Sequence, residues 1–492
     1  MNIPISILHL SDLHRSKDSH TSNSALLASL TNDIERFEDE EPSILKPNVI
    51  VVSGDIVRGS VNHINPDKEI KEQYDEALTF LNNLVNNLLD GDKERIVLVP
   101  GNHDIDRHLS KQSMQAIDEK YFSNTELRMG MLKEATNTCS DIKWCWNTLS
   151  YYKVEDKESY QKRFKAFADF YYTFYDKKRN YLLNPEKQYD IFDMPNLGLS
   201  IVGFNSCYNT DHLNSAGAIH PDCIAEANLE LKKLNGRGRL IVATWHHNTK
   251  GIPYSNNYMD SRFLKNMIDA NIKLGFHGHQ HKTEIIHEEN NVYEQKKIIV
   301  FSSGTLCEEP SGLPVGHNRQ YNIVTIIKDE GDESKLNIVL HSREKTASSS
   351  FENPVWGKGN IDSTVKSHIE MHIGHEIKSL STDQKLLEIE KLIGDKQYEV
   401  AIKKLNKLDK NEPFVRKFLL KCYMSHDDDN FDLILTDFDN PMNVEEAIYV
   451  LSAAITLKDK PKMQELLGIE IISMSDDRSI KQLKEKAGAL LR

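Results

Sequence analysis

The chain begins with Ile5-Ser6-Ile7-Leu8-His9-Leu10, a hydrophobic run that leads directly into Ser11-Asp12-Leu13-His14. A run of this length and composition predicts a buried strand, and the polar residues after it predict a loop at the strand's end. A carboxylate and an imidazole two residues apart can bind one metal ion. A single Asp-x-His pair is weak evidence, because such pairs also occur by chance in surface loops.

The same arrangement recurs four times further along the chain. Taken singly, a Gly-Asp pair is usually a turn, and two nearby histidines can simply be surface residues. Five occurrences in one order, each after a predicted strand, argue against coincidence. The four later runs and the polar segments that follow them are Val49–Val52 with Ser53-Gly54-Asp55, Ile96–Val99 with Pro100-Gly101-Asn102-His103-Asp104, Leu240–Thr244 with Trp245-His246-His247-Asn248, and Ile272–Phe276 with His277-Gly278-His279-Gln280-His281.

The alternation of strands with helices predicts an α/β fold. Helical patterns at about 22–40 and 67–90 separate the first three strands, which is typical of a largely parallel sheet. Ligands bind at the carboxyl ends of such strands, so the five loops are expected to converge. After His281 the pattern becomes purely β and predicts a second, antiparallel sheet packed on the first, with strands at 283–287, 297–302, 321–327 and 336–341.

Residues 105–189 interrupt this rhythm and predict a helical insertion. They carry 15 Lys and Arg against 12 Asp and Glu, a local excess of three positive charges in an acidic chain. Aromatic residues recur at helical spacing between Phe164 and Tyr175. One interpretation makes them a small core of the insertion. The other makes some of them, with Lys177, Lys178 and Arg179, a platform for a nucleic acid base or strand.

The sequence predicts two domains, as its length of 492 residues also suggests. Residues 1–345 would form the catalytic domain, and 346–363, rich in Ser, Asn, Pro and Gly, would form a linker. Residues 364–492 contain only short amphipathic helical patterns, similar to tetratricopeptide repeats. Such arrays usually bind protein, so we expect either a protein partner or self-association through these helices.

Composition excludes some classes of protein. The net charge of -13 argues against a protein that coats nucleic acid by bulk charge, although it leaves room for a local basic groove. No apolar stretch is long enough to span a membrane, and the N-terminus lacks the pattern of a signal peptide. The six cysteines are scattered without zinc-binding spacing, so we expect reduced thiols in a cytoplasmic protein.

The donor set of the five loops predicts a dinuclear metal site. Two carboxylates, one amide and four imidazoles exceed the needs of one ion, whereas two ions that share a bridging carboxylate require about this many. Mixed nitrogen and oxygen ligands favour Mn²⁺, with Fe, Zn²⁺ or Co²⁺ as alternatives, over Mg²⁺ or Ca²⁺. The absence of thiolates argues against structural zinc. The candidate ligands are Asp12, His14, Asp55, Asn102, His246, His279 and His281.

The order of these motifs resembles the calcineurin-like metallophosphoesterases. The resemblance covers about residues 1–345 without the insertion, and it implies two packed β-sheets flanked by helices. It also implies roles for the ligands: Asp12, His14 and His281 would hold one metal, Asn102, His246 and His279 would hold the other, and Asp55 would bridge them. The family normally uses the first histidine of a His-His pair, which favours His246, and His247 remains a candidate.

The resemblance also implies a mechanism. A hydroxide held between the two metals would attack phosphorus in line, while Asn102 hydrogen-bonds a phosphoryl oxygen. His103 would protonate the leaving oxygen, oriented by Asp104. No covalent intermediate with the enzyme would form.

The core motifs leave the substrate open. Arg58 stands where SbcD-like DNA nucleases tend to have histidine and bacterial cyclic-nucleotide enzymes often have an acid. It could be a clamp for a substrate phosphate or simply a surface ion-pair residue. The opening motif is most similar to the bacterial phosphodiesterase branch, so the first hypothesis is a phosphodiesterase for nucleotides or nucleic acid.

Three alternatives remain besides that first hypothesis. One is a DNA nuclease subunit recruited by a partner through the C-terminal helices. Another is a phosphomonoesterase or protein phosphatase. The last is a regulatory interaction protein, although a complete ligand set argues against it.

Overall fold

The chain forms two compact units, Met1–His375 and Glu376–Arg492. Each has a hydrophobic core of its own. The computed structural model describes residues 3–491 except for 61–64, 119–124, 137–138, 146–147, 250–256, 292–295, 329–334, 362–365, 374–381, 426–429 and 476.

Two β-sheets form the centre of the larger unit. The first has seven strands: β1 (Ile5–Leu10), β2 (Val49–Val52), β3 (Ile96–Leu98), β13 (Gln320–Lys328), β14 (Leu336–Lys345), β15 (Trp356–Lys358) and β16 (His368–Ile373). The second has six: β7 (Tyr189–Met194), β8 (Leu199–Phe204), β9 (Leu240–Thr244), β10 (Leu274–His277), β11 (Glu284–Asn291) and β12 (Lys296–Ser302). In the first sheet β1, β2 and β3 run parallel, and in the second β8, β9, β10 and β12 do.

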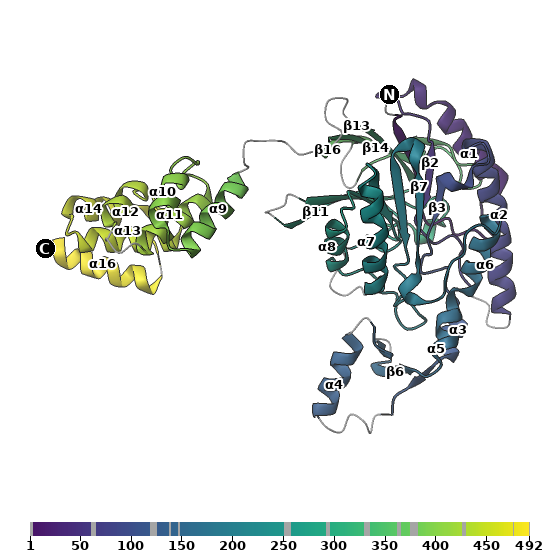
Figure 1. Cartoon of the computed structure of the whole chain (residues 1–492), viewed down its shortest axis with the longest axis horizontal. Helices are drawn as coiled ribbons and strands as arrows, with labels where there is room; N and C mark the ends of the chain where they lie inside the picture. Colours follow the sequence, from purple (N-terminus) through teal and green to yellow (C-terminus); the bar gives the residue numbers. More distant parts are fainter. Residues whose placement is uncertain are drawn as a thin grey trace. The chain divides into compact units, whose positions relative to one another are not determined.

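Helices cover the outer face of each sheet, as Figure 1 shows. Residues alternate between the two faces of each strand, which explains how both faces become buried. In β9, for example, Val242 belongs to the core between the sheets, whereas Ile241 and Ala243 belong to the core beneath the outer helices. The helices on the first sheet are α1 (Asn23–Glu35), α2 (Pro66–Leu88) and α6 (Lys165–Phe174), and those on the second are α7 (Pro221–Asn235) and α8 (Arg262–Asp269).

The prediction of two packed sheets flanked by helices is confirmed, but the predicted division of the strands between them is wrong. The motif strands do not share one sheet, because β1, β2 and β3 lie in the first and β9 and β10 in the second. The late strands do not form a separate sheet either. The β11–β12 hairpin pairs through β12 with β10, whereas β13 pairs with β1.

The insertion is only partly helical, contrary to the prediction. It contains α3 (Arg107–Gln112), α4 (Thr125–Thr136), α5 (Lys157–Gln161) and α6, and it also contains a three-stranded antiparallel sheet. The strands are too short to give a clear sequence signal: β4 (Met114–Ala116), β5 (Ile142–Cys145) and β6 (Ser150–Val154).

The predicted aromatic platform is also wrong for most of its residues. Phe167, Tyr171, Phe174 and Tyr175 are buried in the main core of the larger unit, where no base could stack on them, and Phe170 belongs to the same core. They therefore form neither a nucleic acid surface nor a separate core of the insertion. Arg179 is also engaged, because its guanidinium pairs with Glu94 and Asp190.

The predicted linker at 346–363 belongs to the larger unit instead. β15 pairs with β14, and the buried Trp356 donates a hydrogen bond to Ser29 of α1. The carbonyl of Phe351 accepts a hydrogen bond from buried Arg319. Since β16 also joins β14, the first sheet extends beyond the predicted boundary at residue 345.

The smaller unit is all α-helical, as predicted. Among the described helices, none is long and apolar enough to span a bilayer. Its helices are α9 (Thr382–Gly394), α10 (Tyr398–Leu405), α11 (Pro413–Ser425), α12 (Phe431–Asp437), α13 (Val444–Thr456), α14 (Lys460–Gly468), α15 (Glu470–Ser473) and α16 (Arg478–Leu491).

Candidate metal centre

The five motif loops meet at the carboxyl ends of β1, β2, β3, β9 and β10. The loops cross closely, and two glycines make this possible. A Cβ at Gly278 would lie 1.7 Å from Ser11 Oγ, and one at Gly101 would lie 2.1 Å from Asp55 Oδ1. Any larger residue at either position would therefore displace a loop that carries a predicted ligand.

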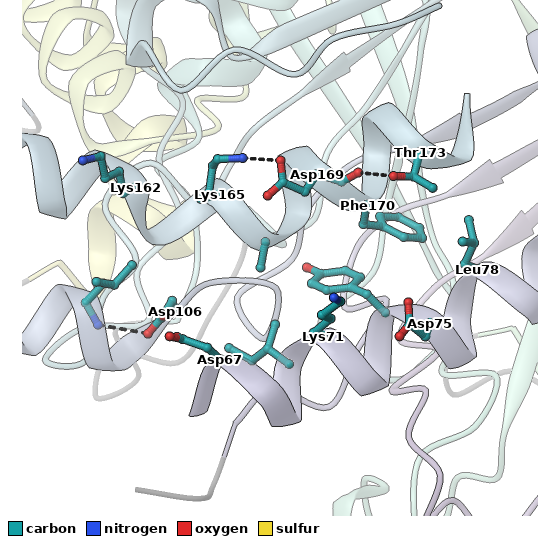
Figure 2. A pocket seen from close by; sticks show the side chains of 14 residues that line it. Asp67, Lys71, Asp75, Leu78, Asp106, Lys162, Lys165, Asp169, Phe170 and Thr173 are labelled. Carbon is teal, nitrogen blue, oxygen red and sulfur yellow. Dashed lines mark hydrogen bonds and ion pairs between the residues drawn. The ribbon is translucent and has the colours of Figure 1, made fainter. Parts of the chain in front are cut away.

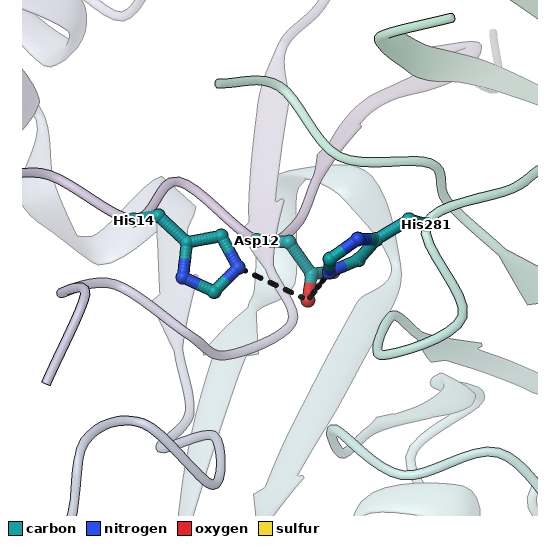
Figure 3. A group of neighbouring side chains, drawn as sticks. All are labelled: Asp12, His14 and His281. Atoms are coloured by element: carbon teal, nitrogen blue, oxygen red, sulfur yellow. Dashed lines mark ion pairs between the residues drawn. The ribbon is translucent and has the colours of Figure 1, made fainter. Parts of the chain in front are cut away.

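Asp12, His14 and His281 form the first cluster of candidate ligands (Figure 3). Asp12 Oδ1 lies 3.2 Å from His281 Nε2 and 3.9 Å from His14 Nε2. Asp12 Oδ1 and His14 Nε2 are both buried, and their neighbours are ionisable side chains: His281 Nε2 lies next to Asp12 Oδ1, and Glu308 Oε2 lies 3.1 Å from His14 Nε2. Two imidazoles and a carboxylate crowded together in a buried place can share one cation, so this cluster fits a metal ion.

Asp55, His246 and His279 form the second cluster. His246 Nε2 lies 3.3 Å from Asp55 Oδ2, 3.2 Å from His279 Nδ1 and 3.1 Å from Asn102 Oδ1. His279 Nε2 is buried and has no hydrogen-bond partner in the described part of the chain. The four side chains predicted for the second metal and its bridge therefore come together.

Asp55 lies between the two clusters. Its Oδ2 is 3.3 Å from His246 Nε2 in the second cluster and 3.9 Å from His14 Nε2 in the first. A carboxylate in this place has the geometry that a bridging ligand needs. All seven predicted ligands thus lie close together, with Asp55 near histidines of both clusters.

Backbone carbonyls fix two of the histidine rings. His246 Nδ1 donates to the carbonyl of Ser53 at 2.8 Å, and His281 Nδ1 donates to the carbonyl of Gly312 at 2.8 Å. Each contact directs Nε2 toward the neighbouring carboxylate. Carbonyl contacts of this kind hold metal-binding histidines in the required tautomer.

The electrostatics reflect this crowding of acids and imidazoles. Burial alone would lower the pKa of His281, but Asp12 raises it to about 9. Burial would likewise lower the pKa of His246, and Asp55 raises it to about 9. Burial and His246 lower the pKa of His279 to about 3, whereas burial and His103 lower that of His14 to about 4. In the metal-free protein, His246 and His281 therefore carry protons at neutral pH, whereas His14 and His279 do not.

His247, the alternative to His246, is already engaged. Its Nδ1 lies 2.9 Å from Ser206 Oγ, and its Nε2 donates to the carbonyl of Ser215 at 3.1 Å. Both ring nitrogens therefore have partners outside the two clusters. The structure thus favours His246 as the ligand.

His103 lies at the edge of the centre and is partly exposed. Its backbone N–H donates to Asp55 Oδ1 at 2.8 Å, and its ring lies 4.9 Å from that of His14. Nδ1 donates to the carbonyl of Arg58 at 2.7 Å, and His103 also forms a group with His14 and Asp55 that could hold a metal ion.

Asp104 does not orient His103, contrary to the prediction. Its buried carboxylate accepts hydrogen bonds from the backbone N–H groups of Gly101, Ile56 and Val57 at 2.7, 3.1 and 3.2 Å. It also accepts one from the Tyr74 hydroxyl at 3.1 Å. Asp104 instead joins the loops after β2 and β3, and the Arg58 carbonyl orients His103.

Arg58 contributes to the centre through its backbone, and its side chain is exposed. Among the described residues its guanidinium forms no ion pair, so the surface ion-pair interpretation lacks support. The sequence motifs do not indicate Glu308, whose carboxylate lies 3.1 Å from His14 Nε2. The only sequence signal is its position in the loop after strand β12.

A separate cavity of about 530 Å³ lies between α2 and α6, and its lining includes none of the seven candidate ligands (Figure 2). Its apolar wall includes Tyr74 and Phe170, whose rings stack at 4.9 Å. Since the Tyr74 hydroxyl binds Asp104, one wall of this cavity is connected to the ligand loops.

Comparison with known proteins identifies the family. Among solved structures, a dimetal phosphatase from Danio rerio is similar at 10% identity and a TM-score of 0.38, over 72% of this chain and 99% of that one. A purple acid phosphatase from yellow lupin (Lupinus luteus) seeds is similar at 11% identity and a TM-score of 0.36, over 70% of this chain and 52% of that one. No curated protein gives a significant match. Residues 5–283, more than half of the sequence, match the family model of the calcineurin-like phosphoesterases, and the chain therefore belongs to that family.

Proposed function

We propose that this phosphoesterase is a dinuclear-metal phosphodiesterase that acts on nucleotides or nucleic acid. The observation that carries the proposal is the position of Asp55, whose carboxylate faces His14 of the first cluster and His246 of the second. Asp12, His14 and His281 hold one cation, and Asn102, His246 and His279 hold the other. We favour Mn²⁺ because the ligands mix nitrogen and oxygen, with Fe, Zn²⁺ and Co²⁺ as alternatives.

When bound, two divalent cations supply Lewis-acid stabilisation of charge on the phosphoryl oxygens and make water a stronger nucleophile. The chain's own residues supply the rest. The Asn102 side chain lies in the second cluster, where its amide can donate to a phosphoryl oxygen. His103 holds one proton on Nδ1 through the Arg58 carbonyl and transfers another from Nε2 to the leaving oxygen.

The exposed side chain of Arg58 favours a substrate with more than one phosphate group. The carbonyl of Arg58 accepts from Nδ1 of His103, the proposed general acid, and its side chain is exposed. Guanidinium groups bind phosphate in a bidentate way. We therefore propose that Arg58 binds a second phosphate of a nucleotide or a nucleic acid strand.

A second candidate is a nuclease subunit that a partner recruits, and the separate C-terminal helical unit favours it. We also propose that this unit binds a protein partner or associates with a second copy of the chain. All six cysteines are free, which suits the reducing cytoplasm that we propose as its location.

The test compares hydrolysis of bis-p-nitrophenyl phosphate with that of p-nitrophenyl phosphate by the Mn²⁺-loaded protein. We expect preference for the diester, and complete loss of both activities in Asp55→Asn together with lower metal content. Preference for the monoester would make the protein a phosphatase, and full activity of Asp55→Asn would contradict the proposed centre.

The substrate class requires a second comparison. Single- and double-stranded DNA, RNA and cyclic nucleotides are incubated with wild type and with Arg58→Ala. We expect the variant to have a higher KM for substrates with several phosphates and an unchanged KM for bis-p-nitrophenyl phosphate. An equal effect on both would show that Arg58 acts through the centre and not through a second phosphate.

A further inference from the structure

The loop after β12 is built around the first ligand cluster. Thr305 Oγ1 donates to the carbonyl of Asp12 at 2.7 Å, and the Leu306 N–H donates to the carbonyl of Ser11 at 3.1 Å. Further along, the Gly312 carbonyl accepts from His281 Nδ1 at 2.8 Å. One loop thus positions the backbone of one ligand and the ring of another.

The same loop places the carboxylate of Glu308 next to His14, the third member of the first cluster. Glu308 Oε2 lies 3.1 Å from His14 Nε2, and the Glu308 side chain is only 19% exposed. Its backbone is fixed at both ends, because the N–H donates to Thr305 Oγ1 at 3.0 Å and the carbonyl accepts from Arg319 Nε at 2.8 Å. These backbone contacts therefore hold Glu308 in a position from which its carboxylate faces the first cluster.

Space for this carboxylate depends on a glycine. A Cβ at Gly312 would lie 2.6 Å from Glu308 Cδ. Gly312 is also the residue whose carbonyl orients His281, so the loop brings its backbone close to both groups at once. The absence of a side chain at this position leaves room for the Glu308 carboxylate next to the backbone that orients the His281 ring.

Two of the distances match those between neighbouring ligands of a single ion, whereas Asp12 Oδ1 and His14 Nε2 lie farther apart, at 3.9 Å. Donor atoms bound at about 2.0–2.2 Å, with bond angles near 90–110°, lie about 2.8–3.6 Å apart. His281 Nε2 and Asp12 Oδ1 are 3.2 Å apart, and His14 Nε2 and Glu308 Oε2 are 3.1 Å apart. We propose that Glu308 is a further ligand of the cation held by Asp12, His14 and His281.

This assignment rests on the proposed function and changes the chemistry of one site. With Glu308 the first site has three carboxylates, including the shared Asp55, and two imidazoles, whereas the second has one carboxylate, one amide and two imidazoles. More oxygen ligands and a higher coordination number favour Mn²⁺ over tetrahedral Zn²⁺. The two sites are therefore unequal, and the first is the stronger Mn²⁺ site.

The test measures Mn²⁺ binding to metal-free full-length protein by calorimetry, with Glu308→Gln as the variant. Glu309→Gln is the matched control, because Glu309 has a similarly buried side chain, 20% exposed, but pairs with His20 Nε2 at 2.7 Å. We expect two sites in wild type, at least tenfold weaker binding at one of them in Glu308→Gln, and no change in Glu309→Gln. Unchanged binding in Glu308→Gln, or equal loss in both variants, would overturn the inference.

Cobalt spectroscopy separates a ligand from a residue that only supports His14. In Co²⁺-loaded protein, loss of a ligand lowers the coordination number and strengthens the visible absorption bands. We expect this change in Glu308→Gln, and an unchanged spectrum would refute direct ligation. Should Glu308→Gln fail to fold, Glu308→Asp gives the same two measurements, since the shorter side chain cannot reach the cation.

The outcomes also separate this inference from the proposed function. Wild type that takes up no divalent cation would refute both. Wild type that binds two ions, with Glu308→Gln binding both at wild-type affinity, would refute only the role of Glu308.

Discussion

At the scale of single residues, the centre concentrates unusual backbone conformations. Five of the seven candidate ligands, Asp12, His14, Asp55, His279 and His281, have φ between 42° and 73°, in the left-handed region. Such conformations cost about 1–3 kcal/mol each in residues other than glycine, and they persist only where surrounding contacts compensate. Here the ladder of backbone bonds between the loops provides that compensation, including Asp12 N–H to the Gly54 carbonyl at 3.1 Å.

The sequence reveals these ligands because each follows a hydrophobic run directly. It does not reveal the partners of Asp104 or the position of Glu308. Those contacts involve backbone groups of Ile56 and Val57, or a histidine almost 300 residues away, and neither leaves a periodic pattern. The sequence thus shows which residue types follow each strand, but it does not show which side chains contact one another.

His103→Ala tests the general acid. Because His103 lies outside both ligand clusters as proposed, we expect the variant to retain both metals. Turnover should fall by about 10²–10⁴-fold for alkyl esters, whose leaving oxygens need a proton. Aryl esters with good leaving groups should lose much less. Rates for a series of leaving groups measure this, and an equal loss across the series would exclude proton donation by His103.

Metal binding should release protons. In the metal-free protein the pKa values of His246 and His281 are about 9, so both imidazoles are protonated at pH 7.5. His14 and His279, with pKa values of about 4 and 3, are already neutral. Cations must displace the protons, so about two should be released and affinity should rise between pH 7 and 9. Calorimetry in buffers of different ionisation enthalpy counts them, and buffer-independent heats would contradict this.

At the scale of secondary-structure elements, hydrophobic runs predict the strands well, but not their partners. β1 and β13 are more than 300 residues apart and pair in a register that no local pattern specifies. The linker prediction is wrong for a related reason, since small polar residues at 346–363 pack through a few buried side chains such as Trp356. The composition of a segment alone therefore does not predict whether it joins a sheet, because this depends on the segments that pack against it.

A buried ion pair joins α1 to the first sheet and provides a test of this packing. Asp33 accepts from Arg343 Nη2 at 2.7 Å and Nε at 2.9 Å, and also from the Tyr321 hydroxyl at 2.5 Å. Asp33→Ala leaves the buried guanidinium short of a partner, so we expect a loss of about 3–5 kcal/mol in the free energy of unfolding. Urea denaturation followed by tryptophan fluorescence measures it. Asp39→Ala, an exposed acid nearby, should change little, and an equal effect would contradict the role of the pair.

At the scale of the whole molecule, each unit has its own core. The core of the larger unit lies within residues 5–373, and that of the smaller unit lies within 386–491. The helical pattern of the smaller unit is visible in the sequence, whereas its resemblance to tetratricopeptide repeats and its binding role remain predictions. All four tryptophans, Trp144, Trp146, Trp245 and Trp356, belong to the larger unit. Tryptophan fluorescence therefore reports on that unit, and far-ultraviolet circular dichroism reports on both.

This difference allows the stability of the smaller unit to be measured within the full chain. Arg416 of α11 pairs with Glu446 of α13 through Nη2 at 2.8 Å and Nε at 3.0 Å, and both residues are buried. Arg416→Met leaves the Glu446 carboxylate without its cation, which should cost about 3–5 kcal/mol. We expect the dichroism transition in urea to begin earlier while the fluorescence transition stays unchanged. Lys410→Met, which removes the more exposed pair with Asp437, should alter neither. A matching shift in fluorescence would show that the two units unfold as one.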